Sequence, residues 1–224
     1  MSYQHQYTDG TRIHFPMGKV VCVGRNYAAH AKELNNPVPT EPLLFIKPGS
    51  CVVSAEGGFN IPQGRGAVHY EIEIAVLIGK PLSRQPSEEE VLDAISGYAP
   101  ALDLTLRDVQ DELKEKGWPW EVAKSFDGAC VLAPFISGFA VKDATKLDVR
   151  LTINGEVRQD SNSAEMLFPI VPLIQHIAGQ FTLQPGDVVL TGTPAGVGPL
   201  QEGDELLMEL PGHTQFNTQV LVRS

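Results

Sequence analysis

Two glutamates, Glu71 and Glu73, alternate with apolar residues in the segment 70–78. If this segment is a β-strand, alternate side chains share a face, so the two carboxylates lie together with their Cα atoms about 7 Å apart. An enclosed face would require a counter-ion for both charges, and a divalent cation that prefers oxygen ligands meets this need. A solvated outer face of an antiparallel strand explains the alternation equally well, so the spacing alone leaves both interpretations open.

Asp103 lies within the apolar run 101–106, where a carboxylate without a partner would be costly to bury. It could therefore supply a third oxygen ligand to the same cation. Taken alone, the run favours a different interpretation, in which Asp103 caps a helix that begins near Leu106.

His30 and Glu33 lie three residues apart in a short segment, 26–34, that is a helix candidate. On a helix this spacing places both side chains on one face, where the carboxylate can hold the imidazole in one tautomer and raise its basicity. The pair could then act as a general base toward water. An exposed helix with an ordinary charge pair is the simpler explanation of the pattern taken alone.

A glycine-rich segment, 191–198, follows an apolar strand near the C-terminal end. It lacks the Gly-Lys-Ser/Thr of a P-loop and does not form a dinucleotide-binding fingerprint. Its backbone N–H groups and the Thr193 hydroxyl could nevertheless bind an anion. A tight turn is the equally good alternative.

Basic residues accompany these segments. In an acidic protein, basic side chains gathered at one site would favour an anionic substrate, although a surface position explains any one of them better. The residues are Arg25, Lys47, Arg107 and Lys124.

The elements that must position these residues are mostly short strands. Apolar or alternating runs bounded by turn residues predict strands at 19–23, 43–46, 70–78, 147–154, 156–159, 187–191, 204–210 and 215–222. Asn154-Gly155 is a strong hairpin signal between two of them. Helices are predicted at 26–34, from a capping box at Ser87 to Gly97, at 106–116 and at 170–178. The pattern indicates a β-rich α+β fold, because strands and helices do not alternate regularly as in a doubly wound sheet.

Composition argues against several classes of function. The 224 residues carry 17 basic and 27 acidic side chains, a net charge of −10, so neither a nucleic-acid partner nor an anionic membrane surface is expected. No apolar run approaches the roughly 20 residues of a membrane span, and no signal-peptide pattern is seen. Three cysteines in apolar settings, Cys22, Cys51 and Cys130, predict reduced thiols and a cytoplasmic location.

Taken together, these segments resemble the fumarylacetoacetate hydrolase family. Each motif is weak alone, but the ordered set is specific and spans most of the chain. The matching motifs are Val23–Tyr27 with His30 and Glu33, Leu44–Pro48, His69–Glu73, Leu102–Gln110, Gly117–Trp120, Lys124–Asp127, Asn154-Gly155, Gly186-Asp187 and Leu190–Pro194. The short N-terminal segment, about residues 1–18, resembles the single-domain branch of the family.

The resemblance implies a mixed β-roll fold that occupies residues 1–224 as one domain and assembles as a homodimer. It implies Mg²⁺ or Mn²⁺ held by Glu71, Glu73 and Asp103. It also implies that His30 and Glu33 lie on a short lid helix that orders when ligand binds.

The implied reaction is the metal-dependent hydrolysis of a C–C bond in a 2,4-diketo acid, such as fumarylpyruvate or acetylpyruvate, through a pyruvate enolate. In this expectation His30, oriented by Glu33, activates water, and Lys124 holds the water or the developing oxyanion. The substrate is a small anionic keto acid. Its predicted contacts are Arg25, Asn26, Lys47, Arg107, Gln110 and Thr193.

Other reactions share the same enolate. The alternatives are therefore oxaloacetate decarboxylation or tautomerisation, and isomerisation or decarboxylation of a 2-hydroxy-dienedioate. A metal- or dicarboxylate-binding protein without turnover is a more distant alternative. Hydrolysis ranks first among these reactions because the pair His30 and Glu33 supplies a reason for an attacking water.

Overall fold

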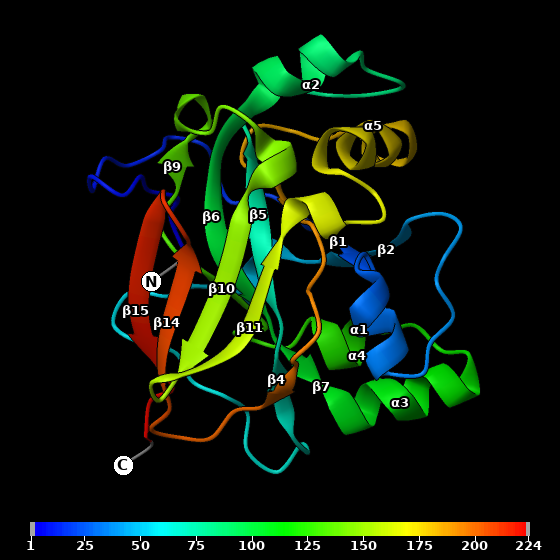
Figure 1. Ribbon diagram of the computed structural model, residues 1–224, viewed down its shortest axis with the longest axis vertical. Coiled ribbons are helices and arrows are strands. Elements are labelled where there is room, and N and C mark those ends of the chain that lie inside the picture. Colours follow the sequence, from blue (N-terminus) through cyan, green and yellow to red (C-terminus); the bar gives the residue numbers. More distant parts are fainter. Residues whose placement is uncertain (1–2, 223–224) are drawn as a thin grey trace.

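Paired apolar strands form the centre of the computed structural model, which describes residues 3–222 (Figure 1). The largest sheet has eight strands in the order β2-β1-β12-β5-β6-β8-β3, with β9 paired to β6. It is mixed, since β1 lies parallel to β12 and β3 lies parallel to β8. The bounds are β1 (Val20–Gly24), β2 (Leu43–Lys47), β3 (Val52–Ser54), β5 (Ile72–Ile78), β6 (Ile95–Asp103), β8 (Cys130–Leu132), β9 (Ile136–Ser137) and β12 (Val188–Leu190).

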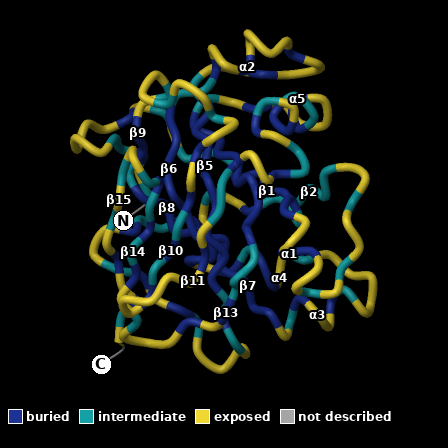
Figure 2. The backbone as a smooth tube through the Cα atoms, viewed as in Figure 1, coloured by how far each residue is buried: buried dark blue, intermediate teal, exposed yellow. Residues whose placement is uncertain are grey.

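Two smaller sheets cover and extend this one. A four-stranded sheet consists of β11 (Glu156–Asn162), β10 (Asp148–Ile153), β14 (Glu205–Leu210) and β15 (Thr214–Gln219), and a three-stranded sheet consists of β13 (Gly198–Pro199), β4 (Val68–Tyr70) and β7 (Thr105–Leu106). Strand β10 packs against β5, and β14 packs against β6, so the core lies between the two larger sheets. Figure 2 shows that the backbone buried deepest follows the central strands, whereas exposed backbone lies in the outer loops and turns.

The helices gather at two places, and only one of them concerns the predicted site. The bounds are α1 (Ala28–Glu33), α2 (Glu88–Ala94), α3 (Arg107–Lys116), α4 (Glu121–Lys124) and α5 (Ile170–Gln180). Helices α2 and α5 pack together at the top of Figure 1, and α1, α3 and α4 lie together at its lower right. Within residues 3–222, none of the helices has the length and apolar character needed to cross a membrane. The β-rich α+β fold predicted from the sequence is confirmed.

Several local predictions are also confirmed. Asn154 and Gly155 have φ values of 52° and 82°, the left-handed pair of a type I′ hairpin between β10 and β11. Ser87 caps α2 as predicted, because its hydroxyl accepts the Glu90 N–H at 3.2 Å while the Glu90 carboxylate accepts the Ser87 N–H at 2.7 Å. The cysteines are free and buried.

The end predicted for the helix after Ser87 is wrong. The helix ends at Ala94 rather than at Gly97, and Gly97 lies inside β6. A Cβ at Gly97 would lie 2.6 Å from the carbonyl oxygen of Ile136, so this glycine permits close approach of β9 instead of terminating a helix. Strand β6 was not expected because it contains Gly97 and Pro100, residues that are uncommon inside strands.

The predicted continuous strand at 70–78 is also wrong. Strand β4 ends at Tyr70 and β5 begins at Ile72, so the chain passes from the three-stranded sheet to the largest sheet at Glu71. Every residue of β5 is buried, because the sheet is covered on both faces. The solvated outer face that the alternation allowed is therefore excluded. At the C-terminal end, the strand predicted at 215–222 stops at Gln219.

Gly186 leads into β12 and provides a test of this packing. Its φ is 93°, and a Cβ there would lie 1.9 Å from the carbonyl oxygen of Pro16. We expect Gly186→Ala to lower the free energy of unfolding by about 3 kcal/mol or more, because left-handed strain adds to a backbone collision. Urea denaturation with an unchanged m-value would measure the loss.

The matched control is Gly212→Ala. Gly212 has a φ of 80°, but no atom lies within 4 Å of its added Cβ. The free energy of unfolding of this variant should fall by only ~1–2 kcal/mol, the cost of left-handed strain alone. An equal fall in the free energy of unfolding in the two variants would show that close packing at Gly186 does not contribute to stability.

Candidate active site

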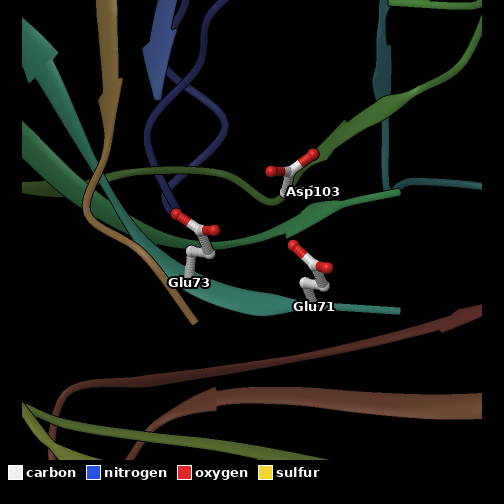
Figure 3. Close-up of side chains that lie close together, drawn as sticks. All are labelled: Glu71, Glu73 and Asp103. Atoms are coloured by element: carbon white, nitrogen blue, oxygen red, sulfur yellow. The ribbon is translucent and has the colours of Figure 1, made fainter. Parts of the chain in front are cut away.

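Three acidic side chains converge at the junction of the sheets, as Figure 3 shows. Glu71 lies between β4 and β5, Glu73 lies on β5, and Asp103 ends β6. Strand pairing brings them together, because the Asp103 backbone N–H donates to the Glu71 carbonyl at 2.9 Å. One carboxylate oxygen from each residue lies within 4.8 Å of the others, and the residues are only 4%, 2% and 1% exposed. Asp103 makes no capping bond to α3, so the helix-cap interpretation is wrong.

Basic side chains neutralise two of these three carboxylates. Lys124 donates to Glu71 Oε2 and to Asp103 Oδ2, both at 2.8 Å. Arg107 binds Glu71 Oε1 through Nη2, and Lys47 Nζ lies 2.8 Å from Asp103 Oδ1. Burial raises the pKa of Glu71, but Lys124, Arg107 and other nearby groups outweigh burial and hold this pKa below its usual range.

Glu73 differs from its two neighbours. Among residues 3–222 it has no basic partner, and its carboxylate accepts a hydrogen bond from the Gly192 N–H. Burial, followed by the charges of Asp103 and Glu71, raises the pKa of Glu73 well above its usual value. Within the same described residues, Asp103 Oδ1 receives no well-directed hydrogen bond although Lys47 is near. A divalent cation fits these buried, under-compensated oxygens, since hard oxygen ligands are those that Mg²⁺ and Mn²⁺ prefer.

His30 lies close to this cluster on α1. It is 5% exposed, and its Nδ1 lies 3.2 Å from Glu33 Oε2. Glu33 Oε1 also accepts the Gly196 N–H at 3.0 Å, which joins α1 to the glycine-rich segment. The bond to Glu33 assigns the proton to Nδ1 and leaves the Nε2 lone pair available as a base. Burial lowers the pKa of His30, with Glu71 and Glu33 opposing this effect, so the imidazole is neutral near pH 7. Because His30 is buried, it does not form an ordinary exposed charge pair with Glu33, the simpler explanation that the sequence pattern allowed.

A narrow cavity connects His30 to the three carboxylates. Five other predicted site residues line it: Arg25, Arg107, Gln110, Lys124 and Thr193. Three of the four basic residues singled out in the sequence therefore gather at this cavity, and Lys47 does not reach its wall.

The structure places neither Lys47 nor Asn26 on the cavity wall, so it does not support their predicted substrate contacts. Lys47 is fully buried and donates to the carbonyl oxygens of Ala129 and Leu104 at 3.0 and 3.4 Å and to that of Lys124. It thus lies beneath the carboxylates and holds the chain around them.

Asn26 is likewise fully buried. Its amide donates to the carbonyls of Thr191 at 2.8 Å and Phe168 at 3.0 Å, and its oxygen accepts the Phe168 N–H at 2.8 Å. It therefore fastens the turn between β1 and α1 to the residues that follow β12 and to those that precede α5.

The glycine-rich segment does bind an anion, but that anion belongs to the protein. Gly192 donates to the buried carboxylate of Glu73. Thr193 Oγ1 accepts a hydrogen bond from Gln159 Nε2 at 2.8 Å, which leaves its own O–H free to donate toward the cavity that it lines.

Some cavity residues were not identified from the sequence. Phe45 and Trp120, whose ring centroids lie 5.8 Å apart, form an aromatic wall, and Lys114 lines the same cavity from α3. The spacing of Arg107, Gln110 and Lys114 at i, i+3 and i+7 could have indicated Lys114, because these positions share a helix face.

Comparison with known proteins identifies the family. Residues 19–221 match the family described as fumarylacetoacetate (FAA) hydrolase C-terminal. The chain belongs to the fumarylacetoacetate hydrolase family. Within it, oxaloacetate tautomerase YcgM of Escherichia coli (strain K12) is 51% identical over 220 residues, which cover 98% of this chain and 100% of that protein.

Similar solved structures support the same family assignment. A fumarylacetoacetate hydrolase family protein from Yersinia pestis CO92 is similar with a TM-score of 0.95 at 50% identity, covering 98% of this chain and 100% of the other. Fumarylpyruvate hydrolase from Pseudomonas aeruginosa, crystallised in complex with Mn²⁺ and pyruvate, is similar with a TM-score of 0.90 at 33% identity, covering 99% and 97% of the two chains. The family and the fold expected from the sequence motifs are confirmed.

Neutral isosteres of the three acidic residues test the cation site. We expect Glu71→Gln, Glu73→Gln and Asp103→Asn each to lose detectable Mn²⁺ binding, because each removes one charged oxygen ligand. Calorimetric titration measures the affinity. The rise in Tm on adding Mn²⁺ measures binding independently, since a ligand of the folded state raises its stability.

The control is Asp93→Asn on α2, which removes an exposed carboxylate that pairs with Lys80. This variant should bind Mn²⁺ like the wild type. Wild-type affinity in any of the three site variants would remove that residue from the ligand set.

Proposed function

We propose that this protein interconverts the enol and keto forms of oxaloacetate, with Mg²⁺ or Mn²⁺ held by Glu71, Glu73 and Asp103. The observation that carries the proposal is a buried His30, hydrogen-bonded to Glu33, in the same cavity as three buried carboxylates. The tautomerase relative, 51% identical across its whole length, supports this reaction over hydrolysis. The fumarylpyruvate hydrolase, at 33% identity, supports a shared enolate-forming site.

Tautomerisation requires one proton to leave and another to arrive. In the keto direction the enol oxygen loses its proton, an enolate forms, and C3 gains a proton. A divalent cation, when bound, would act as a Lewis acid that lowers the energy of the enolate. His30 Nε2 accepts the departing proton, the imidazolium formed is stabilised by its bond to Glu33, and it then gives a proton to C3, which restores the neutral imidazole.

The walls of the cavity orient the substrate. Gln110 Oε1 accepts from Arg107 Nη1 at 2.6 Å, so the amide N–H groups of Gln110 remain available to a carboxylate. The Thr193 hydroxyl is a second free donor. Lys124, whose ammonium lies between Glu71 and Asp103, keeps positive charge next to the position of the reacting oxygen.

Acylpyruvate hydrolysis is the second candidate, because the same base could take a proton from water instead of from an enol. Decarboxylation of oxaloacetate would instead break the C3–C4 bond, releasing CO₂ and leaving the enolate of pyruvate, which the same site could stabilise. These reactions differ from tautomerisation in releasing pyruvate, so product analysis separates them.

We propose that the protein acts as a homodimer and in the cytoplasm. The free, buried cysteines support a reducing compartment.

Loss of enol absorbance in freshly dissolved oxaloacetate measures the proposed activity, and coupled pyruvate detection measures the alternatives. We expect tautomerisation to have the highest kcat/KM, and His30→Ala to lower it by about 10²–10⁴, the usual contribution of a general base. Lys32→Ala, at an exposed position on the same helix, should leave it unchanged. A higher kcat/KM for pyruvate release from acylpyruvates would make hydrolysis the main reaction.

The pH dependence of tautomerisation tests the role of the pair. His30 must be neutral to accept a proton, and burial lowers its pKa below the ordinary value of 6.5. The value of kcat/KM should therefore rise with pH through a limb centred below 6.5 and stay level above it. Glu33 raises this pKa, so Glu33→Gln should move the limb to lower pH and reduce the plateau.

Glu41→Gln, a change at an exposed position beyond α1, serves as the control and should keep the wild-type profile. A limb that does not move in Glu33→Gln would mean that His30 is not the titrating base.

A further inference from the structure

One wall of the cavity is a single face of α3. Arg107, Gln110 and Lys114 occupy positions i, i+3 and i+7 of this helix, and all three line the cavity. With a rise of 1.5 Å per residue, Lys114 lies about 6 Å further along the helix axis than Gln110. The wall therefore offers cationic or polar groups at two levels: Arg107 and Gln110 beside the carboxylates, and Lys114 one turn away from them.

The two levels differ in how their charge is compensated. At the inner level, Arg107 binds Glu71, and Lys124 bridges Glu71 and Asp103. At the outer level, the partner of Lys114 is Asp111, at 3.1 Å, whose side chain is 58% exposed whereas that of Lys114 is 22% exposed. An exposed carboxylate compensates a half-buried ammonium weakly, because water screens the pair.

A second cation in the cavity acts on Lys114. Arg25 also lines the cavity, and within residues 3–222 it has no ion-pair or hydrogen-bond partner. Burial lowers the pKa of Lys114, Asp111 opposes this effect, and the charges of Arg107 and Arg25 lower it further. Mutual repulsion among these cations is relieved when an anion binds between them.

A short α-keto dicarboxylic acid, the substrate class of the proposed function, would place an anion there. In a four-carbon α-keto dicarboxylic acid, the first carboxylate and the keto group must lie at the acidic cluster, where the enolate forms. The second carboxylate is then at the far end of the chain, directed away from the cluster. Arg25 and Lys114 are the cavity cations whose charges the acidic cluster does not neutralise.

We propose that Lys114, together with Arg25, forms a subsite for the second carboxylate of a short α-keto dicarboxylic acid, and that Lys114 makes the protein prefer dicarboxylates. This inference rests on the proposed function, whose reaction uses such an acid. Trp120, with its ring centroid 5.9 Å from Lys114 Nζ, limits the room at this end and favours a short chain.

Paired ligands that differ only in the second carboxylate test the subsite. For turnover the pair is oxaloacetate and 2-oxobutanoate, with exchange of the C3 hydrogens followed by NMR in D₂O. For binding without turnover the pair is malate and 2-hydroxybutyrate, titrated calorimetrically into the Mg²⁺-loaded protein. Lys114→Met should raise KM for oxaloacetate and Kd for malate about tenfold or more, the value of a charge-assisted hydrogen bond.

The same variant should leave kcat for oxaloacetate within about twofold, and the constants for both monocarboxylates unchanged, because Lys114 does not contact the reacting atoms in this proposal. Lys114→Arg should retain most of the preference. Lys116→Met, which removes an exposed lysine paired with Glu112 on the same helix, controls for the loss of one positive charge.

The outcomes separate this inference from the function on which it rests. Equal weakening of mono- and dicarboxylates in Lys114→Met, or unchanged malate binding, would overturn the subsite even if oxaloacetate is tautomerised. If malate binding depends on Lys114 but oxaloacetate is not tautomerised, the subsite stands and the proposed reaction is wrong.

Discussion

Burial of three carboxylates within a few ångströms of one another is the constraint on which the site depends. Each charge is expensive to remove from water, and each raises the cost of the next. Lys124 and Arg107 compensate Glu71, and Lys124 also compensates Asp103, but Glu73 has only the Gly192 N–H. Lys47 also pairs with Asp103, so among residues 3–222 Glu73 is the member of the cluster without a basic partner, and its buried carboxylate favours binding of a divalent ion.

The scaffold around the cluster serves this balance. Pairing of β5 with β6 fixes the distance between Glu71 and Asp103, and the buried ammonium of Lys47 holds the three chain segments that surround them. The base lies apart from these cations, on α1, where burial lowers the pKa of His30 and the hydrogen bond to Glu33 orients its ring. The three carboxylates and a neutral base can thus coexist in one cavity, which is what an enolate-forming reaction at neutral pH requires.

The sequence by itself determined the features that depend on local spacing. Alternation placed Glu71 and Glu73 together, helical periodicity paired His30 with Glu33, and the hairpin at Asn154 needed only its dipeptide, since these patterns arise within a few residues of chain. The ordered motifs also indicated the family and the acidic triad. Local patterns also predicted most of the strands and helices, but some predicted ends are displaced, as where α2 gives way to β6.

Only the tertiary structure decided which of these residues face the cavity. Lys47 and Asn26 lie in motifs that match the family, yet their side chains donate hydrogen bonds to backbone carbonyl groups of distant segments. Lys114 reaches the cavity without any motif of its own. Strand β6 forms despite Pro100 because β5 and β8 pair with it on both sides. These outcomes depend on contacts between residues far apart in the chain, and local periodicity carries no information about which segments meet.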